Sequence, residues 1–524
     1  MTRLLRAAGS ISAFTLLSRI LGLYRDRLMA QTLGAGWVQG TFLLAWTLPN
    51  LMRRLLGEGA LSASLVPAYA KARRNGDPAR ARELLAQVVG TVVTILTPLC
   101  LAVAGTSLVL PAEWLPAPEH GGVEAMRLLL ALNAILFVYA LPVCLTAVCS
   151  GAMNTLGLFA LPAAVPIVLN LFWIGALLLS KPLGYTVDVE IANFAAICLT
   201  VGGFLQLLLV VVPLWRRGEL LRPQLGLPRR GTPAFGVFLA MGPTIVGMSL
   251  NQISSLLDQL MAYFLVAPGA VTYIYLANRL LLFPHALTAM SVAVAVFPKL
   301  AHEAAEVDRK ALRSTLDLAA AATILVTLPA ACGLIVLGDD VVRVLFAGGR
   351  FVESDVWPTV LTSSCLVAGL PFIGLAQLYA RAFYAVGDTG TPARLAARLV
   401  LTNAALNVLL LLTTGLGTGA LALSSSLSSF GNALLLARAF HQHAAPGHDL
   451  RAAWLRSALA TAAMCAVLPF VKVAPAGGTL LARALGNVVL PIVIGIFVYV
   501  LAHWLLRSPE LRALRRRRGE AKAL

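Results

Sequence analysis

The sequence predicts an all-α polytopic membrane protein, and three observations carry this prediction. Apolar residues make up 59% of the 524 residues, whereas charged residues make up only 12%. Apolar windows of about 20 residues, the length of helix that crosses a hydrocarbon core of ~30 Å, recur along the whole chain. Lysine and arginine gather in alternate connections between these windows, as expected for cytoplasmic loops. We therefore expect about 14 transmembrane helices.

The apolar windows give the approximate positions of these helices. In chain order, the predicted spans are 10–32, 37–66, 84–110, 126–150, 158–180, 190–214, 234–266, 271–298, 314–337, 358–381, 395–413, 417–440, 452–473 and 482–506. The second span is the least regular because charged residues interrupt it. The eleventh and twelfth are separated only by the short turn TTGLGTG. The helix count depends mainly on these three spans.

The basic residues also predict the orientation. Most Lys and Arg of the connecting segments fall on one side if both termini are cytoplasmic. The net charge of +18 therefore reflects cytoplasmic loops and a tail beside anionic lipids, and it does not imply nucleic acid. The run Arg515–Arg518 is typical of such a solvated anchor. We predict membrane lipids, and no nucleic acid, as partners.

The cysteines and histidines predict no metal centre. All seven cysteines lie in or beside apolar segments, and no CxxC pair occurs. We interpret them as small packing residues, not as disulfides or metal ligands. Three histidines share one predicted cytoplasmic loop, residues 441–448, but no Cys or Glu in that loop supports a metal site.

The chain repeats itself at an offset of about 231 to 235 residues. DRLMA at 26–30 aligns with DQLMA at 258–262, and VPAYA at 66–70 falls over FPKLA at 297–301. Six spans separate the copies, so both halves enter the membrane in the same sense, and a site is expected between them near the midplane. The predicted parts are an N-lobe (1–230), a C-lobe (231–443), two C-terminal helices (444–507) and a basic cytoplasmic tail (508–524).

Charged side chains lie inside the first two predicted spans. Each costs at least ~2.5 kcal/mol at the bilayer centre, so each should face a polar cavity or a partner. Arginines dominate the set, which favours transport of an anionic substrate. The charged residues are Arg19, Arg25, Asp26 and Arg27 in the first span and Arg53, Arg54 and Glu58 in the second.

Several motifs resemble one known family. SRILGLYRDRLMAQTLGAG at 18–36 and LPNLMRRLLGEGALSASLVP at 48–67 are similar to the MurJ (MviN) lipid II flippases, and PNLMRRLLGEGA is highly specific. The resemblance continues through residues 241–265, 273–284 and 380–392, and is weakest after about residue 440. These flippases belong to the multidrug/oligosaccharidyl-lipid/polysaccharide exporter superfamily.

The resemblance implies a transporter of the bacterial cytoplasmic (inner) membrane. Its substrate would be lipid II, the undecaprenyl-pyrophosphate-linked disaccharide-pentapeptide used for peptidoglycan assembly, cell wall biogenesis and cell shape. Two lobes would rock between inward-open and outward-open states and carry the lipid from the cytoplasmic to the outer leaflet. No bond would be made, so we expect no enzyme activity and no cofactor. We expect a monomer that can associate with the cell-wall synthesis machinery.

The resemblance also implies which residues bind the substrate. Five arginines match the cavity arginines of the family, and their guanidinium forks suit a pyrophosphate. The alternative is that they snorkel or form structural ion pairs near helix ends, as we expect for Arg27. The predicted substrate-binding residues are Arg19, Arg25, Arg53, Arg279 and Arg381.

Three further charged residues are predicted to form a gate or an ion-pair network: Asp26, Arg54 and Glu58. The two acids either only balance neighbouring arginines, or they exchange partners as the lobes rock. The family often has acids at the positions of Gly40, Asn278 and Leu282. Without these three acids, the residues that would form the gating network are not determined by the resemblance. The arginines expected to bind an anion are still present.

A possible cation site is predicted in the C-terminal half. Some members of the family place Na⁺ among an Asp, a pair of Asn/Asp residues and a hydroxyl. The corresponding residues are Asp258, Asn403, Asn407 and Ser424. Because the pair is Asn–Asn, one charge is missing, and interhelical hydrogen bonding is the alternative interpretation.

Other functions remain open beside lipid II flipping. One is a flippase for another undecaprenyl-linked oligosaccharide, and another is a cation-coupled multidrug exporter of the same superfamily. The specific motif and the two extra helices disfavour the first, and the arginine-rich spans disfavour the second. The sequence has no Walker A motif, no paired catalytic acids and no nucleophile–base arrangement, which disfavours a membrane enzyme.

Overall fold

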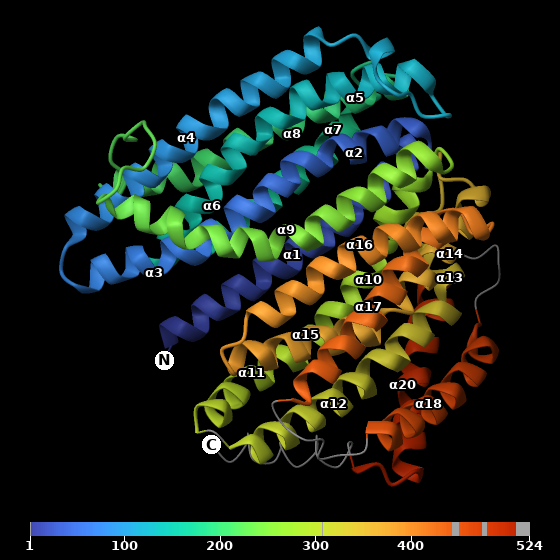
Figure 1. The fold of residues 1–524 in the computed structure, drawn as a ribbon. Coiled ribbons are helices and arrows are strands. Elements are labelled where there is room, and N and C mark those ends of the chain that lie inside the picture. The colour runs from blue at the N-terminus through green and yellow to red at the C-terminus, as the bar shows by residue number, and fades with distance from the viewer. Residues whose placement is uncertain (1, 307, 443–449, 474–478, 510–524) are drawn as a thin grey trace. The chain divides into compact units, whose positions relative to one another are not determined.

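The computed structural model describes residues 2–306, 308–442, 450–473 and 479–509. It does not describe the side chains of residues 2–8, 10, 57–60, 243, 244, 246–248 and 251. Within the described residues the chain is helical and contains no strand beyond an isolated bridge between Gly348 and Phe351 (Figure 1). The predicted all-α fold is therefore confirmed. The basic tail lies outside the described residues from residue 510 onward.

The chain forms two compact units, Met1–Thr272 with Gly348–Phe351, and Tyr273–Ala347 with Val352–Leu524. The helices of the first unit are α1 (Thr2–Leu33), α2 (Trp37–Met52), η1 (Arg53–Ala60), α3 (Leu61–Arg74), α4 (Pro78–Val109), η2 (Ala112–Trp114), α5 (Gly122–Leu136), η3 (Phe137–Tyr139), α6 (Ala140–Thr155), α7 (Ala160–Ser180), α8 (Asp188–Arg216) and α9 (Pro233–Leu265).

The second unit begins within α10. Its helices are α10 (Ala270–Leu287), α11 (Ala289–Ala305), α12 (Arg309–Val336), α13 (Gly338–Phe346), α14 (Glu353–Val367), α15 (Leu370–Ala385), α16 (Gly390–Thr413), α17 (Thr418–Phe440), α18 (Leu450–Val467), η4 (Leu468–Val471), α19 (Leu480–Arg483), η5 (Ala484–Val489) and α20 (Leu490–Leu505).

Every predicted span falls on a helix or on consecutive helices. Eleven helical segments of the described residues are long and apolar enough to cross a membrane. The first, second and seventh predicted spans are helical but are not among those eleven. About 14 transmembrane helices are consistent with this architecture. The short amphipathic helix α13 lay in no predicted span.

The second predicted span, which charged residues interrupt, is helical throughout but locally irregular. Pro49 lies inside α2, and residues Arg53–Ala60 then form the π-helix η1 before α3 continues. A π-helix has a wider turn than an α-helix and occurs frequently at functional sites. The most specific family motif, PNLMRRLLGEGA, therefore coincides with a local irregularity of the backbone.

The core of the first unit contains an aromatic cluster. The ring of Trp46 lies 5.1 Å from that of Tyr139 and 5.2 Å from that of Trp173, and Phe42 lies 5.5 Å from Trp173. These contacts join α2, η3 and α7. Aromatic pairs at such tilted angles add about 0.5–1.5 kcal/mol each beyond their burial. The cluster fixes α2 against the helices that follow it.

Helix α9 groups with the first unit, although the repeat predicts that it opens the C-lobe at residue 231. It packs against α2, η1 and α3. Thr47 Oγ1 on α2 lies 2.6 Å from Gln259 Oε1 on α9 and donates a hydrogen bond to it. The lobe boundary deduced from the repeat stays a prediction, because compactness and repeat ancestry are different criteria.

The connection between α8 and α9 is hydrogen-bonded along α4. Gln224 N donates to Ala86 O at 3.1 Å, Thr91 Oγ1 donates to Gly226 O at 3.1 Å, and Gly226 N donates to Thr94 Oγ1 at 2.9 Å. The connection leads from the first six predicted spans to the next. Its middle is therefore held on one helix of the first unit.

The start of the same connection is held by charge. Glu219 is buried, and both of its carboxylate oxygens accept from Arg73 Nη1, at 3.0 and 3.1 Å. Arg82 Nε lies 3.6 Å from Glu219 Oε2, and Tyr69 Oη donates to Oε2 at 3.4 Å. Burial, followed by the charge of Glu219, raises the pKa of Tyr69 to about 12. Tyr69 lies beyond residue 66, the predicted end of the second span.

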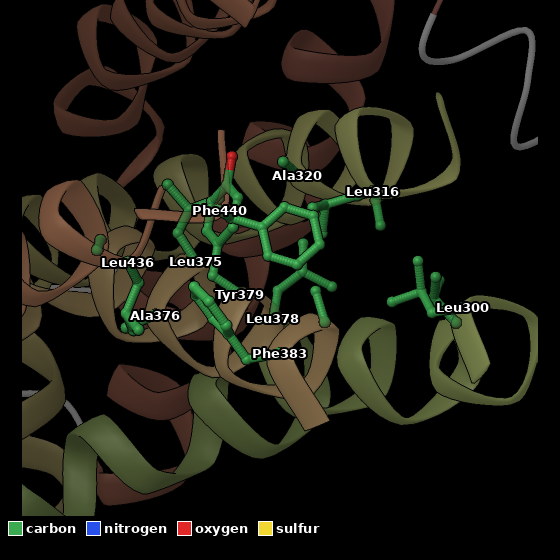
Figure 2. Close-up of a cluster of buried hydrophobic side chains, with 14 of the residues drawn as sticks. Leu300, Leu316, Ala320, Leu375, Ala376, Leu378, Tyr379, Phe383, Leu436 and Phe440 are labelled. Carbon is green, nitrogen blue, oxygen red and sulfur yellow. The ribbon is translucent and has the colours of Figure 1, made fainter. Parts of the chain in front are cut away.

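Figure 2 shows the core of the second unit, which joins α11, α12, α15 and α17. Phe383 and Phe440 meet edge to face with ring centroids 5.2 Å apart, and Leu316 and Leu378 are fully buried. The two C-terminal spans pack onto this unit through α12. Tyr499 Oη on α20 donates to Leu325 O at 2.7 Å.

Candidate substrate and ion sites

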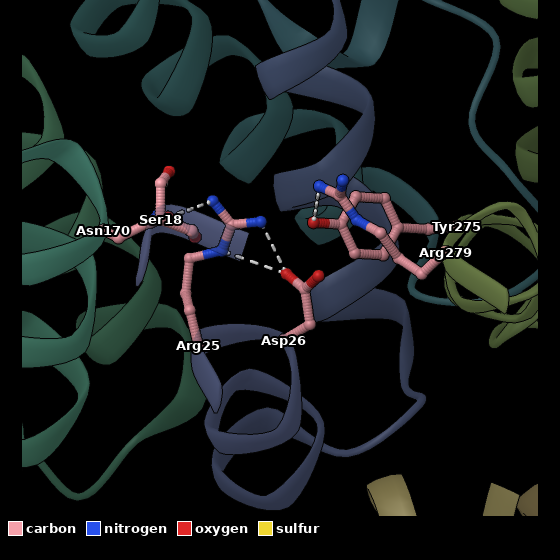
Figure 3. A network of polar contacts seen from close by, with 6 residues as sticks. All are labelled: Ser18, Arg25, Asp26, Asn170, Tyr275 and Arg279. Atoms are coloured by element: carbon pink, nitrogen blue, oxygen red, sulfur yellow. Dashed lines mark hydrogen bonds and ion pairs between the residues drawn. The ribbon is translucent and has the colours of Figure 1, made fainter. Parts of the chain in front are cut away.

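Arg25 and Asp26 form a buried network between α1 and α7 (Figure 3). Arg25 Nε and Nη2 donate to Asp26 Oδ1 at 3.0 and 2.7 Å, and Nη1 donates to Asn170 Oδ1 at 2.9 Å. The guanidinium carbon lies 4.4 Å from the ring centroid of Trp173, a cation–π distance. Asn170 Nδ2 in turn donates to Ser18 O at 3.0 Å. Asp26 therefore holds the geometry of Arg25.

Arg53 and Arg54 lie at the start of the π-helix. Arg53 is half-buried, and its Nε and Nη2 donate to Asn50 Oδ1 at 3.1 and 2.9 Å. Arg54 is exposed, and its Nη1 donates to Gln252 Oε1 on α9 at 3.3 Å. The side chain of Glu58 lies outside the described residues. The backbone of η1 thus presents the two arginines to different partners.

Arg279 lies on α10 of the second unit and is half-buried (Figure 3). Its Nη2 donates to Tyr275 Oη at 2.7 Å, and its guanidinium carbon lies 4.8 Å from the centroid of the same ring. One Tyr thus orients Arg279 by both a hydrogen bond and a cation–π contact. The residue before it, Asn278, donates to Ile274 O at 2.9 Å.

Arg19 and Arg381 differ from the other predicted arginines. Arg19 is exposed on α1, and Arg381 is half-buried on α15. Neither side chain forms a hydrogen bond or an ion pair with any other residue that the structure describes. The two guanidinium groups are therefore not committed to a described protein partner. Arg27, expected to be structural, is half-buried on α1.

The four residues of the predicted cation site are divided between the two units. Asp258 lies half-buried on α9 of the first unit, whereas the other three lie in the second. Asn403 Nδ2 on α16 donates to Ser424 Oγ on α17 at 3.3 Å, and Ser424 Oγ donates to Asn407 Oδ1. All three are buried. They make the interhelical hydrogen bonds of the alternative interpretation, and the cation site stays a prediction.

The missing acid at Gly40 has a steric explanation. A Cβ atom at Gly40 would lie 3.3 Å from Pro268 O and 3.7 Å from Val271 Cβ. Gly40 is buried on α2, so a longer side chain has little room in this packing. A carboxylate side chain is therefore absent at a position where α2 approaches the segment that leads into α10. Leu282, at another position where the family often has an acid, is 48% exposed.

Several partners of the arginines were not predicted from the sequence. Asn170 and Trp173 come from a span about 145 residues away, and no local signal pairs them with Arg25. Tyr275 precedes Arg279 by four residues, so the i,i+4 rule could have identified it. Asn50 precedes Arg53 by three residues and was accessible by the same rule.

The helices and interior arginines define a polytopic membrane transporter, and solved structures show the same fold. A lipid II flippase MurJ in an inward closed conformation matches with a TM-score of 0.77 and 24% identity, covering 95% of this chain and 98% of that chain. An inward-facing multidrug resistance MATE family transporter of the MOP superfamily matches with a TM-score of 0.63 and 13% identity, covering 87% and 98%. At these identities the likeness shows the fold alone.

Sequence comparison identifies the family. The family model described as lipid II flippase MurJ matches residues 29–498. A probable lipid II flippase MurJ of Vibrio cholerae is 31% identical over 468 residues, which cover 88% of this chain and 87% of that protein. A lipid II flippase MurJ of Burkholderia cenocepacia is 31% identical over 442 residues, 83% of each chain. The chain belongs to the MurJ family.

Proposed function

We propose that this protein moves lipid II from the cytoplasmic to the outer leaflet of the bacterial cytoplasmic membrane. The observation that carries the proposal is the family match across residues 29–498, which includes the specific motif and Arg53, Arg279 and Arg381. Relatives that bear this activity in their names match over more than four-fifths of their own length. Transport by alternating access makes and breaks no covalent bond, so the protein acts as a carrier and not as an enzyme.

The arginines supply the charge that the substrate requires. A pyrophosphate that enters a low-dielectric interior needs nearby positive charge, and each guanidinium can donate two parallel hydrogen bonds to it. Arg19 and Arg381 have side chains uncommitted to described residues. Asn50 and Tyr275 orient the guanidinium groups of Arg53 and Arg279. These four arginines are the proposed direct ligands.

Arg25 joins this set by exchange of partners. Its guanidinium bonds to Asp26 and Asn170 in the structure, so a pyrophosphate would have to compete with Asp26 for it. Arg54 and Glu58 are proposed to exchange partners in the same way as the gate moves. A carboxylate that releases an arginine when an anion arrives couples substrate binding to a change of conformation.

The remaining features of transport are proposed from the predicted topology, the family resemblance and the candidate cation site. Both termini are proposed to be cytoplasmic, and the chain is proposed to act as a monomer that can associate with the cell-wall synthesis machinery. Sodium is the proposed coupling ion, with Asp258 as its charged ligand. Replacing sodium by choline should then slow transport, and Asp258→Asn should remove the difference between the two salts.

The test is rescue of a bacterial host whose own lipid II flippase is depleted, with outer-leaflet lipid II as the readout. Wild type should restore growth and outer-leaflet lipid II. Arg53→Ala and Arg279→Ala should lower the rate about tenfold or more, because a hydrogen bond to a charged group contributes roughly 1.5–3 kcal/mol. Arg127→Ala is the matched control, since Arg127 forms only exposed ion pairs with Glu113 and Glu124.

The outcomes separate the parts of the proposal. Rescue lost in both arginine variants and kept in the control supports an arginine-dependent flippase. Rescue that survives both substitutions at matched membrane levels removes these arginines from the mechanism. Failure of well-inserted wild type would argue against lipid II as the substrate.

A further inference from the structure

Two cysteines of the second unit are direct neighbours. Cys332 lies near the end of α12 and Cys465 near the end of α18, and the two thiols form a hydrogen bond with each other. Both are half-buried, whereas Cys144 and Cys149 are buried. The sequence suggested only packing roles for all seven cysteines, because residues 133 positions apart give no local signal of proximity.

The helices that carry this pair are in close contact at the same level. A Cβ atom at Gly333, next to Cys332, would lie 3.6 Å from Met464 Cε, next to Cys465. Helices α12 and α18 pack along each other, and α20 packs on α18. A disulfide needs Cβ atoms about 3.5–4.5 Å apart, and only close helices can meet this without moving the backbone.

Polar contacts at the ends of these helices place the pair near a membrane surface. Lys472, after η4, forms an ion pair with Asp340 at the start of α13, and Asn487 Nδ2 donates to Asp340 Oδ1 at 3.2 Å. Cys332 is four residues from the end of α12, about 6 Å at 1.5 Å per residue. Cys465 is two residues from the end of α18.

The predicted orientation puts this surface outside the cytoplasm. Helix α12 begins with Arg309 and Lys310, and α18 begins near Arg451 and Arg456, all on the predicted cytoplasmic side. The ends of both helices then face the compartment in which disulfides form and persist. The other half-buried cysteines outside this pair, Cys198 and Cys365, have no comparable thiol neighbour among the described residues.

We propose that Cys332 and Cys465 are oxidised to a disulfide that joins α12 to α18 and so fixes the two C-terminal helices to the rest of the second unit. One thiolate attacks the disulfide of an extracytoplasmic thiol–disulfide oxidant and forms a mixed disulfide. The second thiolate then attacks the protein sulfur and releases the oxidant as a dithiol. Two thiols lose two protons and two electrons, and the oxidant accepts both electrons.

The cross-link has a mechanical consequence. In the structure α18 and α20 are held to α12 by packing and by the Tyr499–Leu325 hydrogen bond, and their flanking segments are held to α13 by the contacts of Asp340. A covalent bond near the helix ends would prevent α18 and α20 from separating from α12 during transport. The C-terminal helices would then move with the rest of the second unit in every conformational state.

The experiment is mass spectrometry of the full-length protein, from cells trapped during growth with acid and a thiol-alkylating reagent. Digestion without reductant should give one peptide pair linked through Cys332 and Cys465, and it should disappear after reduction. Cys332→Ser and Cys465→Ser should each abolish the linked pair, whereas Cys198→Ser should leave it unchanged.

Complete alkylation of both thiols in trapped wild-type cells would overturn the proposal. A linked pair in which either cysteine bonds to a different residue would also overturn it. The wild-type measurement needs no variant to fold. The readout is covalent and independent of transport, so its failure is distinguishable from a failure of the proposed flippase function.

Discussion

The most quantitative prediction concerns Gly90 on α4, which faces the connection between α8 and α9. A Cβ atom at this position would lie 1.9 Å from Gln224 O, 2.3 Å from Gln224 C and 2.8 Å from Gln224 N. These are backbone atoms, so no side-chain rotation can relieve the overlap. Gly90→Ala therefore has to displace the connection by more than 1 Å from the helix.

The displacement removes the hydrogen bonds that hold this segment. Three bonds join Ala86, Thr91 and Thr94 of α4 to the connection, and each contributes about 1 kcal/mol. Alanine regains about 1 kcal/mol over glycine within a helix. The substitution should therefore lower the free energy of opening of the connection by about 2 kcal/mol. Because about 1.4 kcal/mol is a factor of ten, opening should become about 30-fold more frequent.

Amide hydrogen exchange followed by mass spectrometry measures this opening directly. Peptides that contain the Gln224 and Gly226 amides should exchange about 30-fold faster in Gly90→Ala. Gly105→Ala on the same helix is the control, because a Cβ atom there meets nothing within 4 Å. Equal exchange of this segment in the two variants would show that the connection tolerates a Cβ atom at residue 90.

Three further predictions test other parts of the structure. Ser424→Ala should lower the free energy of unfolding by about 1–3 kcal/mol, because it removes one hydrogen bond from each of the buried amides of Asn403 and Asn407. Thermal unfolding in detergent, compared with exposed Thr402→Ala, measures this loss. Arg25→Lys should lower the unfolding temperature more than Arg127→Lys does, because an ammonium group cannot reproduce the planar contacts of Arg25 to Asp26, Asn170 and Trp173. Comparable unfolding temperatures of the two variants would contradict this. Because the pKa of Tyr69 is raised to about 12, the stability that the protonated phenol contributes should be complete below pH 10 and lost as the pH rises through 12. An ultraviolet difference titration of wild type against Tyr69→Phe should therefore show a midpoint near pH 12. A midpoint near pH 10 would contradict the burial of this phenol.

The sequence predicted the helices well because membrane spans are long, apolar and locally encoded. The positions of α7, α8 and α12 follow directly from hydropathy. The family resemblance rested on contiguous motifs and is confirmed by the match across residues 29–498. The second span was predicted only to be irregular, and not to contain the π-helix at Arg53–Ala60, because the choice between a kink and a wider turn depends on packing.

Contacts between distant segments were the part that the sequence could not supply. The partnership of Arg25 with Asn170 and Trp173 depends on how α1 packs on α7. The proximity of Cys332 to Cys465 likewise depends on the packing of α12 against α18. Such contacts join residues more than 100 positions apart, and the periodicity of a single sequence does not predict them.

The most direct test of the proposed function is transport by the purified full-length protein in vesicles. Fluorescent lipid II is placed in the membrane, and the fraction exposed to a membrane-impermeant quencher is followed over time. Lipid II should cross faster than in protein-free vesicles, and Arg279→Ala should slow the crossing about tenfold or more. A rate equal to that of protein-free vesicles, with folded and inserted protein, would contradict it.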